Sequence, residues 1–216
     1  MPYYIKEIFH TLQGEGQRAG RAAVFCRFSG CNLWTGREED RAKATCRFCD
    51  TDFVGTDGDG GGVFENAEAL AAAIVDKFPY GVGTGYTPYV VLTGGEPTLQ
   101  LDTALIEALH KAGCEIGMES NGTREVPYGV DWITISPKAG AKLVVNKGHE
   151  LKVVWPQEGM DEKQLRTLER LDFDYFLLQP CDNAQQKDNV QTCVEWCQKN
   201  PQWRLCIQMH KVIGVQ

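Results

Sequence analysis

The sequence predicts an α/β fold built around a largely parallel sheet, and three observations support this prediction. Apolar runs with the composition of strands alternate with amphipathic runs of helical periodicity. The apolar runs end in polar residues or glycine. The chain has 216 residues, of which 43% are hydrophobic, and this suits one domain with a single core.

Seven segments are predicted to be strands because they are short, apolar and bounded by polar or glycine residues. In chain order they are Ala22–Phe28, Tyr89–Thr93, Glu115–Glu119, Trp132–Ser136, Glu150–Val154, Tyr175–Gln179 and Arg204–Gln208. The carboxyl ends of parallel strands are where α/β proteins assemble ligand sites. The residues that follow these strands are therefore the first candidates for function.

Four helices are predicted from their capping residues and from the spacing of their apolar residues. Asn66 and Asp102 can cap the first two helices. Asp161 and Gln164 have the spacing of a capping box before the third helix. The fourth helix is predicted at about Asp188 to Lys199.

Composition and charge restrict the partners of the protein. The formal net charge is -7 and Lys and Arg form no stripe, which argues against nucleic acid or an acidic membrane as the main partner. The sequence has no run of about eighteen apolar residues, and residues 1–6 lack the features of a signal peptide. We therefore expect a soluble, cytoplasmic protein that acts on a small molecule.

One low-complexity stretch extends from Gly55 to Gly62. Its glycine and aspartate content is similar to that of a calcium loop or a phosphate-binding loop, but it has the spacing of neither. The composition favours a mobile surface loop.

Cys31, Cys46 and Cys49 carry the strongest functional signal. A CxxC pair that follows a third cysteine can hold an iron-sulfur cluster through three thiolates, which leaves one iron without a protein ligand. Structural zinc sites and ordinary electron-transfer clusters normally have four protein ligands. The open iron indicates a bound substrate or cofactor. S-adenosylmethionine is the leading candidate, because its amino and carboxylate groups can chelate iron.

The other six cysteines are expected to pack in the core as reduced thiols. Cys193 and Cys197 have the spacing of a buried helical stripe, and Cys26, Cys114, Cys181 and Cys206 adjoin or lie within predicted strands. Cys26 could complete a four-cysteine set, but it would then have to break its predicted strand. A zinc site with histidine as the fourth ligand is an alternative for the three functional cysteines. The histidines show no paired metal-binding spacing; they are His10, His110, His149 and His210.

Polar residues and glycines follow four of the predicted strands. The segment Thr93-Gly94-Gly95-Glu96-Pro97 could let a ligand approach the backbone, and Glu96 could accept a hydrogen bond from an ammonium group. Three further strand ends carry donors and acceptors suited to ribose, carboxylate or adenine, namely Glu119-Ser120-Asn121, Ser136-Pro137-Lys138 and Gln179-Pro180-Cys181-Asp182. A cofactor site would need several such strand ends around one sheet.

The cysteine motif, with Phe48 in the aromatic position before the last ligand, resembles that of the radical S-adenosylmethionine superfamily. The usual spacing in that superfamily is three residues between the first two cysteines, whereas fourteen separate Cys31 from Cys46. A longer loop can still bring the thiolates together, because its closure entropy grows slowly with length. The resemblance implies a 4Fe-4S cluster, S-adenosylmethionine as the source of a 5′-deoxyadenosyl radical, and a modified, incomplete (β/α) barrel with few helices.

Within the superfamily, nearly the whole chain resembles the 7-carboxy-7-deazaguanine synthase family, some members of which share the long gap between cysteines. The resemblance implies a single domain at residues 1–216, with an N-terminal substrate-binding extension and a long loop at 32–45 inside the cluster motif. The implied reaction converts 6-carboxy-5,6,7,8-tetrahydropterin to 7-carboxy-7-deazaguanine with release of ammonia, in 7-deazapurine (queuosine precursor) biosynthesis. The similar segments are Thr11–Gly16, Arg27, Cys49–Thr51, Thr93–Pro97, Glu119–Thr123, Ser136–Lys138 and Gln208–Lys211.

These motifs and the resemblance predict the site residues. Cofactor binding is expected at Phe48, Asp50, Gly94, Gly95, Glu96, Glu119, Asn121, Ser136, Pro137, Lys138, Gln179 and Asp182. Substrate binding is expected at Leu12, Gln13, Gly14, Glu15, Arg27, Thr93, His210 and Gln216. The resemblance also implies that Thr51 binds Mg²⁺ through its oxygen. No side chain is assigned as a catalytic base, and a surface salt bridge is the alternative role for Glu15 and Arg27.

The family resemblance also implies a homodimer and an electron donor such as flavodoxin or ferredoxin. Two other classes of protein stay open. A radical activase that acts on a protein partner would share the cluster chemistry, although it usually has the shorter cysteine spacing. A zinc-binding structural module is the alternative that is not an enzyme.

Overall fold

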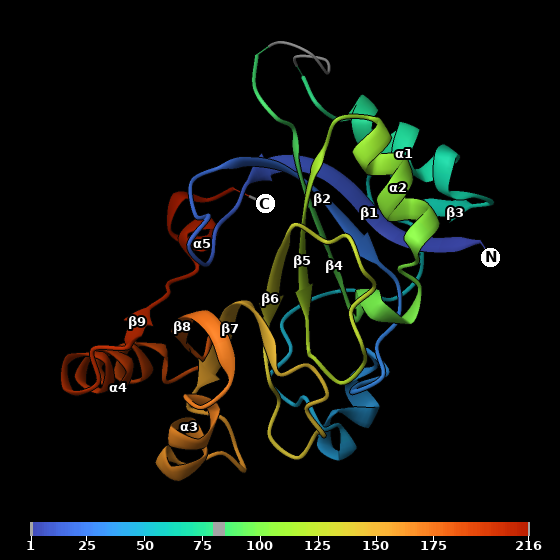
Figure 1. Ribbon diagram of the computed structural model, residues 1–216. Helices are drawn as coiled ribbons and strands as arrows, with labels where there is room; N and C mark the ends of the chain where they lie inside the picture. Colours follow the sequence, from blue (N-terminus) through green and yellow to red (C-terminus); the bar gives the residue numbers. More distant parts are fainter. Residues whose placement is uncertain (1, 80–84, 216) are drawn as a thin grey trace.

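One open, mostly parallel sheet organises the protein (Figure 1). The computed structural model describes residues 2–79 and 85–215. Within these residues, the strands pair in the order β3-β1-β2-β4-β5-β6-β7-β8-β9. They are β1 (Tyr3–Leu12), β2 (Ala22–Phe28), β3 (Gly62–Phe64), β4 (Tyr89–Gly94), β5 (Glu115–Ser120), β6 (Trp132–Ile135), β7 (Lys147–Trp155), β8 (Asp172–Pro180) and β9 (Trp203–Leu205).

Strand β1 runs antiparallel to β2 and β3, and each neighbouring pair from β2 to β9 is parallel. The two edge strands, β3 and β9, do not pair with each other, so the curved sheet does not close into a barrel. The predicted α/β class with a largely parallel sheet is confirmed. Strands β1 and β3 were not predicted. The strand predicted at Arg204–Gln208 exists but is shorter and begins one residue earlier, because β9 spans Trp203–Leu205.

The helices connect the strands and are short. They are α1 (Ala67–Asp76), α2 (Thr103–Lys111), α3 (Glu162–Leu168), α4 (Gln186–Lys199) and α5 (Met209–Ile213), with 3-10 helices η1 (Glu38–Lys43) and η2 (Pro97–Leu99). The predicted caps of the first two helices are confirmed, because Asn66 accepts from the backbone of Ala69 and Asp102 accepts from that of Leu105. Asp161 and Gln164 form the predicted capping box. Helix α5 was not predicted.

Two pairs of helices lie against different parts of the sheet (Figure 1). Helices α1 and α2 pack on β1, β2, β4 and β5 through a core that includes Leu70, Leu105 and Ile116. Helices α3 and α4 pack on β7 and β8 through Leu165 and Cys193. Burial of these apolar side chains away from water supplies the main stabilisation of both layers.

Successive residues of a strand point to opposite faces of the sheet. One face packs against the helices, and the other faces a cavity. In β2, Val24, Cys26 and Phe28 belong to the helix-covered core, whereas Phe25 and Arg27 line a cavity. Cys26 is completely buried in that core, which agrees with its predicted structural role. The polar face of the sheet is therefore the face that carries the candidate site.

The segment Gly55–Gly62 lies at the surface and is hydrogen-bonded to β1. The backbone N–H of Ile8 in β1 donates to the carbonyl of Asp59 at 2.7 Å, and Gly58 N–H donates to the carbonyl of Lys6 at 2.9 Å. A Cβ added at Gly58 would lie 2.6 Å from that Lys6 oxygen. The glycines allow this surface segment to lie directly against the backbone of β1, a contact that its composition did not predict.

The described part of the chain contains no helix that is long and apolar enough to cross a membrane.

Candidate active site

A cavity of about 430 Å³ opens at the carboxyl ends of the parallel strands. Almost all of the predicted site residues line it: Leu12, Gln13, Gly14, Glu15, Arg27, Cys31, Cys46, Phe48, Cys49, Asp50, Thr51, Thr93, Gly94, Gly95, Glu119, Asn121, Ser136, Lys138, Gln179, Asp182 and His210. Glu96 and Pro137 are buried outside the lining, and Gln216 lies outside the described residues. Segments that are distant in the sequence therefore meet at one place.

The long insert between the first two cysteines folds back on itself. The backbone N–H of Thr45 donates to the carbonyl of Leu33 at 3.1 Å, so the residue before Cys46 lies beside the second residue after Cys31. Helix η1 occupies part of the insert. The fourteen residues between Cys31 and Cys46 thus form a loop whose two ends lie side by side. Because the ends are close, the CxxC pair and the distant third cysteine line the same cavity.

The three thiols are close enough to influence one another electrostatically. A hydrogen bond between Cys46 and Cys49 lowers the pKa of Cys49 to about 6 and raises the pKa of Cys46. Burial raises the pKa of Cys31, although the backbone N–H of Leu33 donates to its sulfur at 3.4 Å. Iron is bound by thiolates, so cluster assembly would release protons from these groups.

The donor set fits an iron-sulfur cluster, because three cysteine thiols line one cavity and such clusters are held by thiolates. In residues 2–79 and 85–215, no three His, Cys, Asp or Glu side chains are already arranged to hold one metal ion. Of the four histidines, only His210 lines the cavity.

The Thr93–Pro97 segment lies directly against the cysteine loop. Gly95 N–H donates to the carbonyl of Phe28 at 3.2 Å, and Glu96 N–H donates to that of Gly30 at 2.9 Å. A Cβ on Gly95 would overlap the Gly30 carbonyl oxygen and approach the Cβ of Cys31 to 2.9 Å. Glycine is therefore required at position 95 for contact between the segment and the first cysteine.

We predict that Gly95→Ala displaces the cysteine loop, because the backbone of Gly30 cannot move away as a flexible side chain could. The expected destabilisation is roughly 1–3 kcal/mol, together with a lower iron content after anaerobic reconstitution. Urea unfolding of the cluster-free protein and iron analysis would measure the two effects. Wild-type values for both would show that the close contact does not exist.

Glu96, which was predicted to bind a cofactor, lies behind the lining of the cavity. Its carboxylate is completely buried and accepts from the Thr98 and Ser120 hydroxyls at 2.6 and 2.8 Å and from the Asn121 backbone at 2.8 Å. It also accepts from the backbone N–H of Thr98 at 3.0 Å. These bonds tie the end of β4 to the end of β5, so Glu96 positions the two strand ends that line the cavity.

A buried charge network occupies the substrate side of the cavity. The Lys152 ammonium forms an ion pair with Glu15 and lies 3.8 Å from Glu119. Glu15 also accepts hydrogen bonds from Gln179 at 3.3 Å and Gln208 at 3.0 Å. The Lys152 side chain is only 6% exposed, so the predicted alternative of a surface salt bridge does not describe Glu15.

The network keeps its charges despite burial. Burial would lower the pKa of Lys152, but the carboxylates of Glu119 and Glu15 outweigh this effect and raise the pKa above its ordinary value. Burial would raise the pKa of Glu15, but Lys152 outweighs it and lowers the pKa. Glu15 and Lys152 therefore form an ion pair at neutral pH.

Arg27 and Glu7 form a second partly buried pair in the same cavity, with 2.7 Å between Arg27 Nε and the Glu7 carboxylate. Their side chains are 18% and 17% exposed. A guanidinium has five N–H donors, so this contact leaves Arg27 donors that could face a ligand. The strand β2 places Arg27 on the cavity face, opposite the core residue Cys26.

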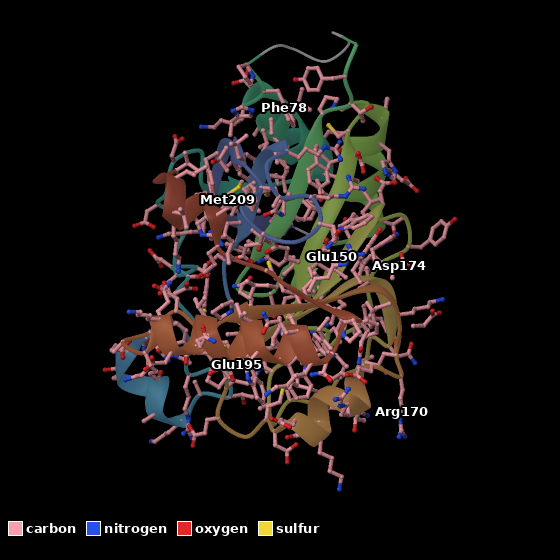
Figure 2. All side chains as sticks on the ribbon, turned by 90° about the vertical axis from the view of Figure 1, so that its left-hand side faces the viewer. Phe78, Glu150, Arg170, Asp174, Glu195 and Met209 are labelled. Carbon is pink, nitrogen blue, oxygen red and sulfur yellow. The ribbon has the colours of Figure 1, made fainter. Side chains whose placement is uncertain are left out.

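Glu150 in β7 is hydrogen-bonded to the N-terminal segment that follows β1. It is 3% exposed and lies at the centre of the molecule in Figure 2, unlike Glu195, which is exposed on α4. Its carboxylate accepts from Gln17 N–H at 2.6 Å and from the Thr134 hydroxyl at 2.9 Å. The turn that carries Glu15 into the cavity is thus fixed to β7.

Helix α5 closes the cavity from the C-terminal side. It lies beside the N-terminal segment (Figures 1 and 2), and the backbone N–H of Met209 donates to the carbonyl of Gly14 at 2.9 Å. The Lys211 ammonium lies 2.5 Å from both Asp50 and Asp182. Lys211 therefore links the cysteine loop, the end of β8 and the C-terminal helix.

Several lining residues were not predicted. They are chiefly Glu7, Trp34, Lys152, Gln208 and Lys211. Lys152 could have been identified from the sequence, because a charged lysine in a predicted buried strand needs a partner of opposite charge. Lys211 lies in the segment Gln208–Lys211 that carries the family resemblance, but no role was predicted for it, because its contacts depend on helix α5 lying next to the cysteine loop.

Comparison with known proteins agrees with this site. The profile of the Radical SAM superfamily matches residues 41–172, a segment that includes Cys46 and Cys49. The 7-carboxy-7-deazaguanine synthase of Nitratidesulfovibrio vulgaris is 61% identical over 218 residues, and that of Burkholderia multivorans is 56% identical over 215 residues. Both alignments cover 100% of this chain and 100% of the relative.

A solved structure is also similar. The crystal structure of QueE from Escherichia coli superposes with a TM-score of 0.68 at 30% sequence identity, over 97% of this chain and 95% of that one. Together with the open parallel sheet, this similarity confirms the expected incomplete barrel of the radical S-adenosylmethionine type. The full-length identity to named synthases favours an enzyme over a zinc module, and a synthase over an activase. The chain belongs to the 7-carboxy-7-deazaguanine synthase family of the radical S-adenosylmethionine superfamily.

Proposed function

We propose that this enzyme converts 6-carboxy-5,6,7,8-tetrahydropterin to 7-carboxy-7-deazaguanine and releases ammonia, as a step in queuosine precursor biosynthesis. One observation carries the proposal. The three cysteine thiols line the same cavity as the buried network of Glu15, Lys152 and Glu119. A radical source and a recognition site for a polar heterocycle would therefore be adjacent. We propose that residues 1–216 form a single domain and that its N-terminal segment contributes to substrate binding.

The cofactors would be held by the predicted cavity residues. Cys31, Cys46 and Cys49 would bind the 4Fe-4S cluster. S-adenosylmethionine would be surrounded by residues of the strand ends and of the cysteine loop, namely Phe48, Asp50, Gly94, Gly95, Glu119, Asn121, Ser136, Lys138, Gln179 and Asp182. When bound, the reduced cluster and S-adenosylmethionine supply the 5′-deoxyadenosyl radical that starts the reaction. Lys138 donates to the carbonyl and hydroxyl of Ser136 at 2.7 Å each, which orients its ammonium group near Phe48.

The buried carboxylates suit the pyrimidine edge of a pterin. That edge carries amino and ring N–H donors, and Glu15 and Glu119 are acceptors when ionised. Lys152 would keep Glu15 ionised in the absence of substrate and would hold it in place beside Glu119. Gln13 donates to Glu119 at 3.1 Å and would orient it in the same way.

Arg27 and Thr51 would bind the other end of the substrate. The Arg27 guanidinium offers paired N–H donors for a carboxylate. Thr51 lines the cavity two residues after Cys49, where its oxygen could bind Mg²⁺ together with oxygens of the substrate. His210 and the C-terminal Gln216 are the other substrate-binding residues that we propose.

Aromatic side chains would protect radical intermediates from water. Phe9, Phe25, Trp34 and Phe53 line the cavity, and Phe9 stacks on Phe25 with ring centres 5.6 Å apart. A cavity that excludes water also strengthens the ionic contacts with the substrate. We assign no side chain as a catalytic base.

We further propose a cytoplasmic homodimer that receives its electron from flavodoxin or ferredoxin. The nine cysteines are all free, which suits a reducing compartment. The reduced cluster needs a one-electron donor, and small redox proteins of this kind supply one.

Anaerobic reconstitution with iron and sulfide, followed by reduction, tests the proposal. After addition of S-adenosylmethionine, Mg²⁺ and the tetrahydropterin, mass spectrometry should detect 7-carboxy-7-deazaguanine. Omission of Mg²⁺ should reduce the rate. Cleavage of S-adenosylmethionine with the pterin unchanged would contradict the proposed substrate, and zinc without sulfide in the protein would contradict the cluster.

A further inference from the structure

The insert between Cys31 and Cys46 contains an arginine that contacts the cysteine loop directly. The Nη1 group of Arg41 in η1 donates to the backbone carbonyl of Arg47 at 2.8 Å and to that of Cys49 at 3.0 Å. These carbonyls lie on either side of Phe48, within the CxxC segment. One guanidinium group therefore fixes the backbone at both ends of the Arg47–Cys49 segment.

Trp34 holds Arg41 in place from the other side. The centre of the guanidinium lies 4.1 Å from the centroid of the Trp34 ring, and the Trp34 indole N–H donates to the carbonyl of Arg37 at 3.1 Å. Trp34 is 7% exposed and packs edge-on against Phe53. The stacked arginine is thus anchored between the buried start of the insert and the cysteine loop.

Glu38 completes the arrangement. The Nε group of Arg41 donates to both oxygens of this carboxylate at 2.8 and 2.7 Å. The Glu38 side chain is 77% exposed, whereas that of Arg41 is 29% exposed. Water screens the exposed carboxylate more strongly than it screens the arginine, and of the two groups it is the guanidinium that contacts the backbone of Cys49.

We propose that Arg41 is a positioning residue for the iron-sulfur cluster, which it serves by fixing the Cys46–Cys49 backbone and by raising the reduction potential of the cluster through its positive charge. The potential of such clusters depends on nearby charge and on the surrounding hydrogen bonds. The long insert would then act as an outer support of the cluster rather than as a passive loop. This inference rests on the cluster in the proposed function.

The positioning effect can be measured without any cofactor. In apo protein, Arg41→Met should increase the amide hydrogen exchange of the peptide spanning residues 44–52 at least tenfold, because the carbonyls of Arg47 and Cys49 lose their donor. Arg37→Met is the matched control. Arg37 is in the same insert, but its side chain is 71% exposed and its ion pair with Glu39 is 3.9 Å long. The control should exchange as wild type does.

The charge effect is measured in the reconstituted protein by a redox titration followed by electron paramagnetic resonance. At a fixed potential, Arg41→Met should have about a tenfold smaller ratio of reduced to oxidised cluster than wild type, which is a shift of 59 mV for a one-electron couple. Arg41→Lys keeps the charge but loses the planar fork, so it should retain most of the potential while still increasing exchange. A purely structural role would leave the potential of the bound cluster unchanged.

The outcomes separate this inference from the proposed function. If Arg41→Met matches Arg37→Met in both exchange and potential, Arg41 has no such role. If Arg41→Met binds no cluster or does not fold, the exchange of Arg41→Lys decides the positioning role, and the potential of the neutral, polar variant Arg41→Gln decides the charge effect; wild-type values in these two measurements would contradict the proposal. A wild-type protein that assembles no iron-sulfur cluster would instead contradict the proposed function, whatever the exchange data show.

Discussion

Replacement of Lys152 by methionine is expected to destabilise the protein by about 3–5 kcal/mol, the range for removal of one partner from a buried ion pair. Lys152 is the cation for both Glu15 and Glu119, and its side chain is 6% exposed. Methionine would fill similar space but leave two carboxylates without a positive partner. The free energy of unfolding from urea titration of the apo protein measures the loss.

Lys147→Met is the matched control, because Lys147 is exposed at the start of the same strand, β7. Its free energy of unfolding should stay within about 0.5 kcal/mol of wild type. Adding Glu15→Gln to Lys152→Met should restore part of the lost stability, because it removes one of the unpaired carboxylates. Equal stabilities of the two single lysine variants would show that the buried network does not form.

Replacement of Cys46 by alanine is expected to abolish the cluster and, with it, all turnover. Cys46 is buried, its thiol is hydrogen-bonded with Cys49, and it lines the cavity together with Cys31. Two thiolates cannot replace three in holding a cluster that already has one open iron. Iron and sulfide content and visible absorbance after anaerobic reconstitution measure the loss.

Cys197→Ala is the control for that substitution. Cys197 is half-buried on α4, where it packs against the second core cluster and does not line the cavity. It should retain full cluster content, with a stability loss of about 1 kcal/mol. If Cys46→Ala kept its iron and sulfide, another residue would have to be the third ligand, and the assignment of the cysteine motif would be wrong.

Local patterns predicted the parallel part of the fold well. Asn66, Asp102 and Asp161 cap helices where the sequence placed them, because capping depends on hydrogen bonds within one turn. Strand β1 was missed although it has ten residues, since charged Lys6 and Glu7 interrupt its apolar pattern. Both side chains have partners that come from elsewhere in the chain: Asp57 for Lys6 and Arg27 for Glu7.

The candidate site was predicted chiefly by its motifs. Cysteine spacing and strand-end residues identify ligands that face a cavity, and nearly all of them do line one. The sequence could not show that Glu96 is turned inward, because its partners Ser120 and Asn121 lie at the end of another strand. The role of Lys211 could not be predicted for a similar reason, since its partners Asp50 and Asp182 are distant in the sequence and meet it only because α5 lies over the cavity.

The stoichiometry of turnover tests the central claim most directly. In a single reconstituted sample, the amount of 7-carboxy-7-deazaguanine formed is compared with the amount of S-adenosylmethionine consumed. If the cavity joins a radical source to a pterin site, many product molecules should form for each S-adenosylmethionine lost. Consumption of S-adenosylmethionine with no deazaguanine product would contradict the claim that the cysteines and the Glu15–Lys152 network serve one reaction.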